Sequence, residues 1–243
     1  MRNLFKSFIM FFIAFALFTT VVYAWFTNTT TNEVQPVNVD VMRRDVELDI
    51  EYGKNGGSYT SFDEPAELNA YLQNSLPADF VNVRVTIRNN NDVSAPDMQV
   101  ELSLKNVRAS LSDLPYDLTD FFYLENANIK LTWYSSLVDY ENDTSYLIQN
   151  IALDTISDDE VIYQGLPLYN ERLSNLFDYT YEGEELVVTN NISILDPTNL
   201  PSLHIIVVEF VIGFDPYTPN QGVGIQDGEL LIDGLYSFIG EED

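Results

Sequence analysis

Hydrophobic and polar residues alternate along much of this chain, in the period of two that is typical of β-strands with one buried face. The alternation is strictest in residues 81–88 and 98–105, which lie on either side of an Asn-rich segment at residues 89–92. Two such runs with a turn sequence between them predict an antiparallel hairpin. Further strands are predicted at residues 129–134, 145–153, 186–195, 203–214 and 229–239.

The first predicted strand begins after a polar segment. Val37, Val39 and Val41 share one face of this strand, and the alternation resumes at residues 46–50. Residues 43–45 change the phase between the two parts, which predicts a β-bulge at that point.

Turn and helix signals interrupt the strands. Asn-Gly-Gly at residues 55–57 predicts a turn, and apolar residues at helical spacing predict short helices within residues 63–76 and 168–177. The longest apolar run, residues 205–212, predicts a central strand that is covered on both faces. Many strands with few helices favour a mainly β protein, built as an antiparallel β-sandwich with short helical insertions.

The N-terminus has the pattern of a secretion signal. Arg2 and Lys6 precede an apolar run at residues 8–22, and a signal peptidase could cut at the small residues that follow, between Ala24 and Trp25. The apolar run is short for a membrane-spanning helix, which needs about 20 residues. We therefore expect export with cleavage near Ala24, and an uncleaved signal that serves as a marginal anchor is the alternative.

This signal divides the chain into three parts. Residues 1–24 are the expected secretion signal, residues 25–36 an extended N-terminal arm, and residues 37–243 one β-sandwich domain. We expect a protein that is secreted or held at the cell surface. Signal peptidase is its partner during export, and no contact with the membrane is expected once the signal is removed.

Charge and composition narrow the possible functions. The formal charge of −27 becomes −29 when Arg2 and Lys6 leave with the signal, and such a polyanion repels nucleic acid. The acidity suits solubility outside the cell, and the alternative is binding of a divalent cation such as calcium. The chain has no cysteine, so neither a disulfide nor a thiolate metal site nor a cysteine nucleophile is available.

Candidate chemistry is sparse. The single histidine, His204, falls within a predicted strand, so we expect a sheet residue rather than a metal ligand. The sequence has no HExxH, GxSxG or Walker motif, and no GxGxxG ahead of a helix. Carboxylates occur close together at residues 158–160 and 182–185, but their spacing does not match an EF-hand. We interpret them as solvated charges on loops, and a calcium site is the alternative. We expect no enzyme and no cofactor, with calcium left open.

Several segments resemble the TasA/camelysin family. Residues 21–27, Val-Val-Tyr-Ala-Trp-Phe-Thr, are similar to that family's signals, which an ER-type (SipW-like) peptidase cuts at an Ala followed closely by an aromatic residue and Ser or Thr. Residues 37–41 look like its first strand, residues 80–104 like its second hairpin and residues 220–238 like its C-terminal end. The chain departs from the family at residues 35–37, where Gln-Pro-Val replaces the frequent Ala-Gly-Thr.

The resemblance implies a jelly-roll type of sandwich and assembly into extracellular fibres of a biofilm matrix. Some relatives carry a metallopeptidase label, which we do not extend to a chain with one histidine and no HExxH. The alternative function is a monomeric adhesion or binding module at the cell surface, tethered by an uncleaved signal anchor.

The general properties of β-strands also favour a fibre, independently of this resemblance. An unpaired sheet edge can accept an extended segment from a neighbouring subunit, and such head-to-tail exchange continues into a homopolymer. We expect the arm to be the donor, with Trp25 and Phe26 as its anchors and with Val34 and Val37 at its end. A disordered spacer is the alternative role for the arm.

Overall fold

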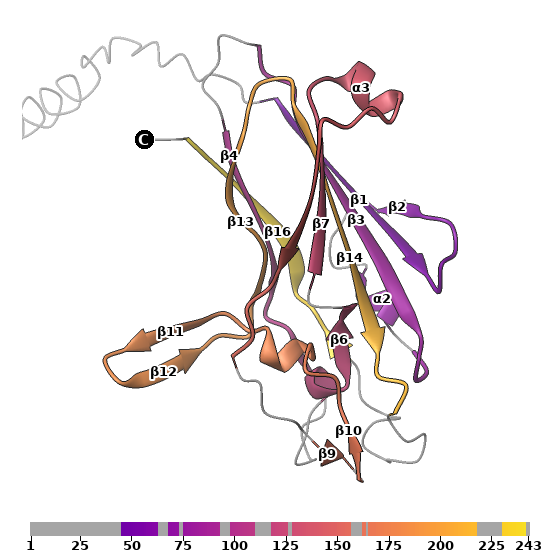
Figure 1. The fold of residues 1–243 in the computed structure, drawn as a ribbon, viewed down its shortest axis with the longest axis vertical. Helices are drawn as coiled ribbons and strands as arrows, with labels where there is room; N and C mark the ends of the chain where they lie inside the picture. The colour runs from indigo at the N-terminus through magenta and orange to yellow at the C-terminus, as the bar shows by residue number, and fades with distance from the viewer. Residues whose placement is uncertain are drawn as a thin grey trace, which may run out of the picture. The chain divides into compact units, whose positions relative to one another are not determined.

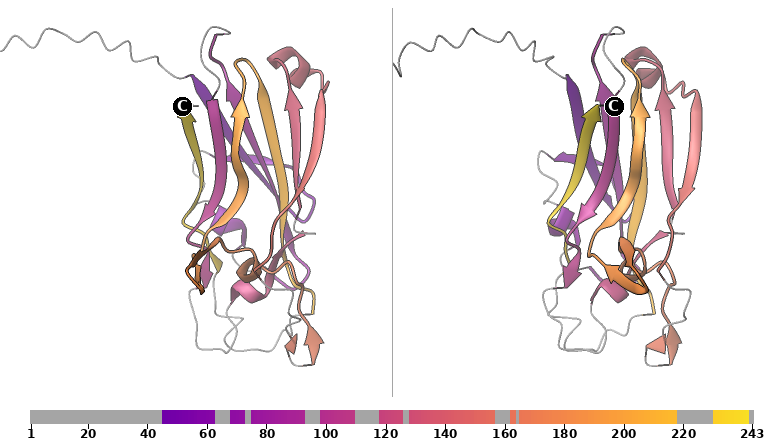
Figure 2. Two further views of the ribbon diagram at one scale, coloured as in Figure 1. Left: turned by 60° about the vertical axis from the view of Figure 1, so that its left-hand side comes forward. Right: turned by 90° about the vertical axis from the view of Figure 1, so that its left-hand side faces the viewer.

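The computed structural model describes residues 45–62, 68–72, 75–92, 98–109, 118–125, 128–156, 162–163, 165–217 and 230–241. Residues from Arg44 to Asp243 belong to one compact unit, in which two antiparallel sheets pack face to face (Figures 1 and 2). The predicted fold class, mainly β with an antiparallel sandwich and short helices, is therefore confirmed. The jelly-roll type stays a prediction.

The larger sheet contains seven strands, all paired antiparallel. Six of them follow the order β2-β1-β3-β14-β7-β8, and β6 pairs with the end of β14. Their bounds are Val46–Lys54 for β1, Thr60–Phe62 for β2, Phe80–Asn89 for β3, Phe122–Leu124 for β6, Asn128–Tyr134 for β7, Leu147–Ala152 for β8 and Ile205–Phe214 for β14.

The smaller sheet contains three strands in the order β13-β4-β16. Their bounds are Met98–Lys105 for β4, Ile192–Leu200 for β13 and Gly234–Glu241 for β16. The strands β3 and β4 were both predicted correctly, but the hairpin between them is wrong, because β3 pairs with β1 and β14 whereas β4 lies in the other sheet. Each strand thereby gains two neighbours and buries one face in the core.

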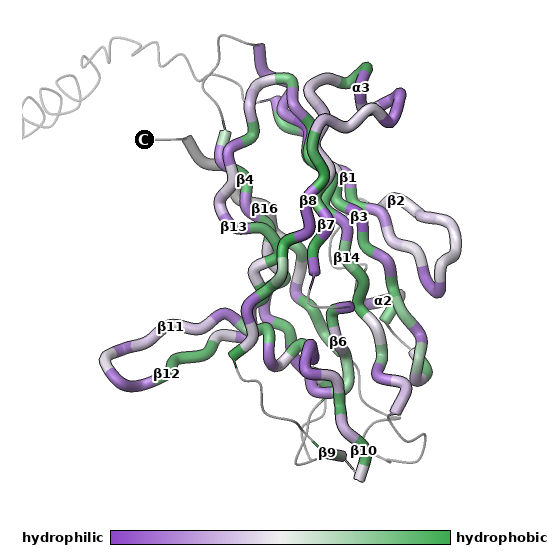
Figure 3. The backbone as a smooth tube through the Cα atoms, viewed as in Figure 1, coloured by the Kyte–Doolittle hydropathy of each residue, from purple (hydrophilic) through white to green (hydrophobic). Residues whose placement is uncertain are grey.

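The strand β14 is the centre of the larger sheet, as its apolar sequence, interrupted only by Glu209 within residues 205–212, predicts. It pairs with β3 on one side and β7 on the other, and eight of its ten residues are buried. Its inner face lies in the main core, whereas its outer face is covered only around Ile205 and Val207, so the predicted cover on both faces holds for one end of the strand. Figure 3 shows the hydrophobic character of this strand beside its more alternating neighbours.

The inner faces of both sheets form one hydrophobic core. Val83 and Ile87 of the larger sheet belong to the same buried cluster as Leu102 and Ile194 of the smaller sheet. Burying each such side chain stabilises the fold by about 1.5–3 kcal/mol. The core therefore joins the two sheets into a single packed unit.

Short elements complete the unit. They are the hairpins β9–β10 (Ile162–Tyr163 and Leu166–Pro167) and β11–β12 (Tyr179–Glu182 and Glu185–Val188), the pair β5–β15 (Arg108–Ala109 and Leu230–Leu231), the helices α2 (Leu68–Leu72) and α3 (Leu137–Glu141), and the 3-10 turns η2 (Leu118–Asp120) and η4 (Leu173–Asn175). The single strand predicted at residues 186–195 is wrong, because β12 ends at Val188 and β13 begins at Ile192.

The helix predicted within residues 168–177 is also wrong. Only η4 is helical there, and Leu168, Leu173 and Leu176 are buried without a continuous helix. The backbone N–H of Tyr169 donates to the buried carboxylate of Asp215 at 3.1 Å, which ties the start of this segment to the residue after β14. The predicted helix in residues 63–76 is confirmed only as α2, and Leu76 lies outside that helix and is exposed.

Helix α3 covers one end of the outer face of the larger sheet. Ser136 caps its N-terminus by accepting a hydrogen bond from the backbone N–H of Asp139. Tyr140 on the helix meets the ring of Tyr134 edge to face at 5.3 Å, above the buried side chains of Ile205 and Val207. The sheet therefore has a second, small apolar cluster on the side opposite the main core.

Candidate functional site

The most unusual surface of the described residues is the edge strand β8. No described strand pairs with its outer edge, and all six of its residues are exposed. Its sequence, Leu-Ile-Gln-Asn-Ile-Ala, contains no charged residue and no proline, and Ile148 keeps 58% of its surface exposed. Figure 3 shows hydrophobic residues at both ends of this strand. A long, uncharged, apolar edge is a template for pairing with another strand.

The difference in width between the sheets explains why β8 is exposed. Ile151 pairs with Ile129, which is completely buried, so both side chains point to the inner side of the larger sheet. The smaller sheet has only three strands and ends at β13, so it does not cover the inner side of β8. The sandwich is consequently open along the side between β8 and β13.

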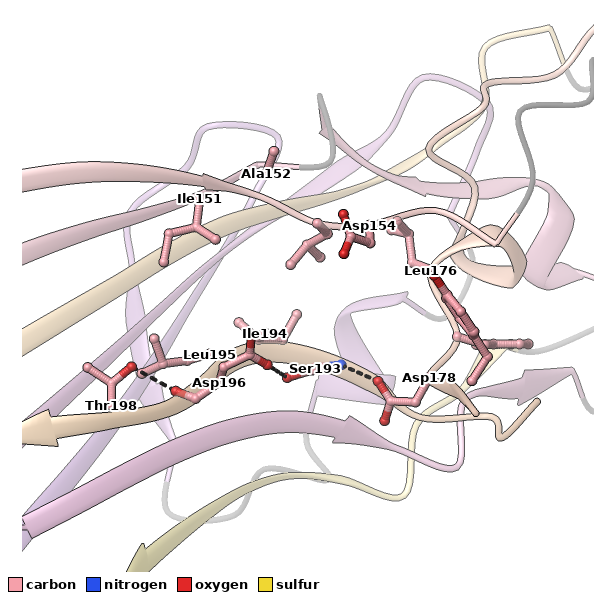
Figure 4. Close-up of a pocket in the computed structure, with 13 residues that line it drawn as sticks. Ile151, Ala152, Asp154, Leu176, Asp178, Ser193, Ile194, Leu195, Asp196 and Thr198 are labelled. Atoms are coloured by element: carbon pink, nitrogen blue, oxygen red, sulfur yellow. Dashed lines mark hydrogen bonds between the residues drawn. The ribbon is translucent and has the colours of Figure 1, made fainter. Parts of the chain in front are cut away.

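This open side forms a groove of about 420 Å³. Ile151 and Ala152 line it from β8, and Ile194 and Leu195 line it from β13, with Leu176 at one end. Figure 4 shows Ile151 and Leu195 on opposite sides of the groove with their side chains directed into the space between them. Ile194, Leu195 and Leu176 are buried side chains of the core, so the groove gives an extended apolar segment access to the core.

Polar groups hold the β13 side of the groove in place. The carboxylate of Asp178 accepts a hydrogen bond from the backbone N–H of Ser193 at 3.0 Å, and the hydroxyl of Ser193 lies 2.9 Å from the carboxylate of Asp196 (Figure 4). The hydroxyl of Thr198 donates to the backbone carbonyl of Asp196 at 2.7 Å. These hydrogen bonds satisfy polar backbone and side-chain groups of β13 that have no partner in β4.

The β13 edge of the smaller sheet and the β2 edge of the larger sheet carry features that oppose pairing. The pairing of β13 with β4 shifts register twice between Ser193 and Thr198, and Pro197 in that interval has no N–H to donate. At the far side of the larger sheet, β2 is only three residues long. Bulges, proline and short strands are the common protections of sheet edges, and β8 has none of these features.

The hairpin β11–β12 projects from the sandwich beside the groove (Figure 1). Tyr179 at its base lines the groove and meets Tyr181 edge to face at 6.1 Å. Tyr181 keeps 68% of its surface exposed, and Leu186 and Val188 on β12 are also exposed. Exposed tyrosines next to an open apolar groove are typical of protein interfaces.

The sequence predicted neither the groove nor the exposed edge as a site. Ala24, Trp25, Phe26, Val34 and Val37, the proposed cleavage site and donor arm, lie outside the described residues. The alternation rule predicted β8 as a strand but gave no sign that it is an edge. Its apolar residues occur in adjacent pairs at both ends, a pattern that fits a strand with two apolar faces.

His204 lies just outside the strand in which it was predicted. It comes directly before β14, its Nδ1 lies 2.9 Å from the carbonyl oxygen of Ser202, and its ring meets Tyr146 edge to face. Among the described residues, no three His, Asp or Glu side chains gather where they could hold a metal ion. The acidic residues at 182–185 lie exposed around the β11–β12 turn, and residues 158–160 lie outside the described part.

Comparisons with protein-family models, with curated proteins and with solved structures give no match to this chain. Within the part of the chain that the structure describes, no helix has the length and apolar character required to span a membrane.

Proposed function

We propose that this protein is an exported structural subunit that assembles into extracellular fibres. The observation that carries the proposal is the open β8 edge with the apolar groove beside it, because a folded unit with an uncovered strand gains stability when another strand covers it. The occupant that we propose is the N-terminal arm of a second copy of this chain.

The sequence of the arm suits such a role. Trp25 and Phe26 can each bury a large apolar surface, and Val34 and Val37 add apolar side chains at the end of the arm. A strand from the arm beside β8 would turn every second side chain toward Ile151 and Leu195 and the others toward water. Pairing with β8 would also satisfy the unpaired backbone groups of that strand.

The geometry of this exchange leads to a filament. The donor segment and the acceptor groove are different parts of the chain, so the contact is heterologous and each added subunit presents a new groove. A polymer of this kind needs no enzyme activity and no cofactor. The high negative charge keeps unassembled subunits soluble and slows non-specific association.

Electron microscopy of negatively stained protein tests the proposal directly. A chain that begins at Trp25 is compared with one that begins at Val37, each with and without calcium. We expect filaments only from the longer chain. Single particles from both chains under all conditions would contradict fibre assembly, and would favour the monomeric surface module.

Engineered cysteines locate the contact, because the chain has no native cysteine. Val37→Cys combined with Ile151→Cys places one thiol on the arm and one in the groove. Under oxidation we expect a ladder of disulfide-linked oligomers on a non-reducing gel. Val37→Cys combined with Leu203→Cys, in an exposed turn away from the groove, is the matched control. An equal ladder from the control pair would show that the groove is not the acceptor.

A further inference from the structure

A second hollow lies on the outer face of the larger sheet, on the opposite side from the core. Its volume is about 460 Å³, within the usual range of small-molecule sites. The side chains around it are mainly polar: Tyr59, Asn82, Glu125, Asn128, Lys130 and Asn150. These residues come from distant parts of the sequence, and only the pairing of the strands brings them together.

Strand register places three carboxamides around the hollow. Asn82 on β3 pairs with Val211 of β14, and the neighbouring pair Glu209–Lys130 aligns β14 with β7. Lys130 in turn pairs with Asn150 of β8. Side chains two residues apart on one strand share a face, so Asn128 lies on the same outer face as Lys130.

The charged groups near the hollow other than Glu125 are already matched to one another. Lys130 Nζ lies 2.7 Å from one carboxylate oxygen of Glu209, and Arg84 Nε lies 3.0 Å from the other. The guanidinium of Arg84 also lies over the ring of Tyr59, 4.1 Å from its centroid. The charges hold the wall and floor of the hollow in place and leave little free charge to attract an ionic ligand.

The three asparagine carboxamides differ from the charged groups in their hydrogen bonding. Within the described part of the chain, the side chains of Asn82, Asn128 and Asn150 make no hydrogen bond to the protein. Each carboxamide offers two N–H donors and one carbonyl acceptor. Asn82 is half-buried at the floor of the hollow, where access to water is reduced. Three carboxamides with free hydrogen-bond donors and acceptors therefore surround one hollow. They match a ligand that carries many groups able both to donate and to accept hydrogen bonds.

We propose that this hollow binds a sugar unit of a neutral polysaccharide. Sugar hydroxyls donate and accept hydrogen bonds, as carboxamides do, and a hollow of about 460 Å³ has room for a sugar ring. The net charge of −27 and the carboxylate of Glu125 at the hollow disfavour phosphate or uronate ligands. The proposal is independent of fibre assembly, because it concerns the opposite face of the sheet from the groove.

Isothermal titration calorimetry with the full chain tests this site. The probes are a neutral cello-oligosaccharide, a neutral chito-oligosaccharide and a galacturonate oligosaccharide, each at up to roughly 10 mM to detect millimolar affinity. We expect saturable binding of at least one neutral probe and none of the uronate. The variants Asn128→Ala and Asn150→Ala should each weaken that binding by roughly tenfold.

Matched variants separate the hollow from non-specific effects. Asn190→Ala replaces an exposed asparagine in the turn before β13 and should leave binding unchanged. Asn128 and Asn150 are exposed, so their replacement should leave the unfolding midpoint unchanged. Absence of binding to both neutral probes, preference for the uronate, or equal binding by the Asn128→Ala and Asn150→Ala variants would each overturn the proposal.

Discussion

Gly213 shows how a single residue is held by its neighbour across the sheet. It pairs with Tyr123 of β6, and the Tyr123 ring lies directly over it, where a Cβ atom would overlap the ring. Tyr123 cannot move freely, because its other contacts include a stacked ring of Tyr169 at 4.4 Å. Cover of a strand glycine by a tyrosine compensates for the missing side chain.

The variant Gly213→Ala should therefore lose stability. The added methyl group must displace the Tyr123 ring, which we expect to lower the free energy of unfolding by about 1–3 kcal/mol in urea denaturation. In a Tyr123→Ala background the same change should be neutral or stabilising, because the methyl group then meets no ring. An equal loss in both backgrounds would contradict this account.

Glu209 carries a pH-dependent part of the stability. Partial burial opposes its charge, but hydrogen bonds from Lys130 and Arg84 outweigh burial and hold the pKa of Glu209 below its ordinary value of 4.5. A carboxylate with a lowered folded pKa stabilises the fold above the unfolded pKa, and the contribution is lost as the pH falls through the folded pKa.

We expect Glu209→Gln to lower the free energy of unfolding by about 1 kcal/mol at neutral pH, since its partners are partly exposed. The difference from the unchanged chain should vanish at a pH below the folded pKa of Glu209, where that carboxyl is itself neutral. Urea unfolding at several pH values measures this difference. Glu141→Gln, an exposed glutamate on helix α3, is the control, and a constant difference across the pH range would refute the assignment.

The strands β4 and β8 have opposite roles at the scale of elements. Leu102 in β4 is 0% exposed, whereas Leu147 in β8 is 40% exposed. The difference arises because β4 is the centre of its sheet and faces the larger sheet, and β8 is an edge without cover.

Truncating each leucine distinguishes these roles. We expect Leu102→Ala to lower the free energy of unfolding by about 2–5 kcal/mol, through lost burial and a cavity. Leu147→Ala should lower it by less than about 1 kcal/mol in the unassembled chain. Similar losses from both variants would mean that the β8 side of the sandwich is covered in solution.

At the scale of the whole molecule, the mismatch of a seven-stranded and a three-stranded sheet is the dominant feature. A wide sheet over a narrow one must leave some inner surface without a partner. Here that surface lies along β8, and the groove exposes it beside buried residues such as Ile194 and Leu195. A strand from another subunit would supply the missing cover, which is why the open side supports the assembly proposal.

Alternation and turn signals in the sequence determined the strands and the fold class. The runs that became β3, β4 and β7 alternate because successive side chains of a strand point to opposite faces, which is a local property of the backbone. The turn predicted at residues 55–57 occurs after β1, where Asn55 and Gly56 adopt positive φ. The apolar sequence of β14 predicted its central position, because a strand between two neighbours is largely buried.

Only the tertiary structure decided which strands pair. Burial energy chooses partners across the whole chain, so β3 and β4, neighbours in sequence, joined different sheets. The same long-range pairing left β8 at an edge and gathered Asn82, Asn128 and Asn150 around one hollow. Neither the groove nor the hollow has a sequence signature, because each is made by residues that are adjacent only once the sheets have formed.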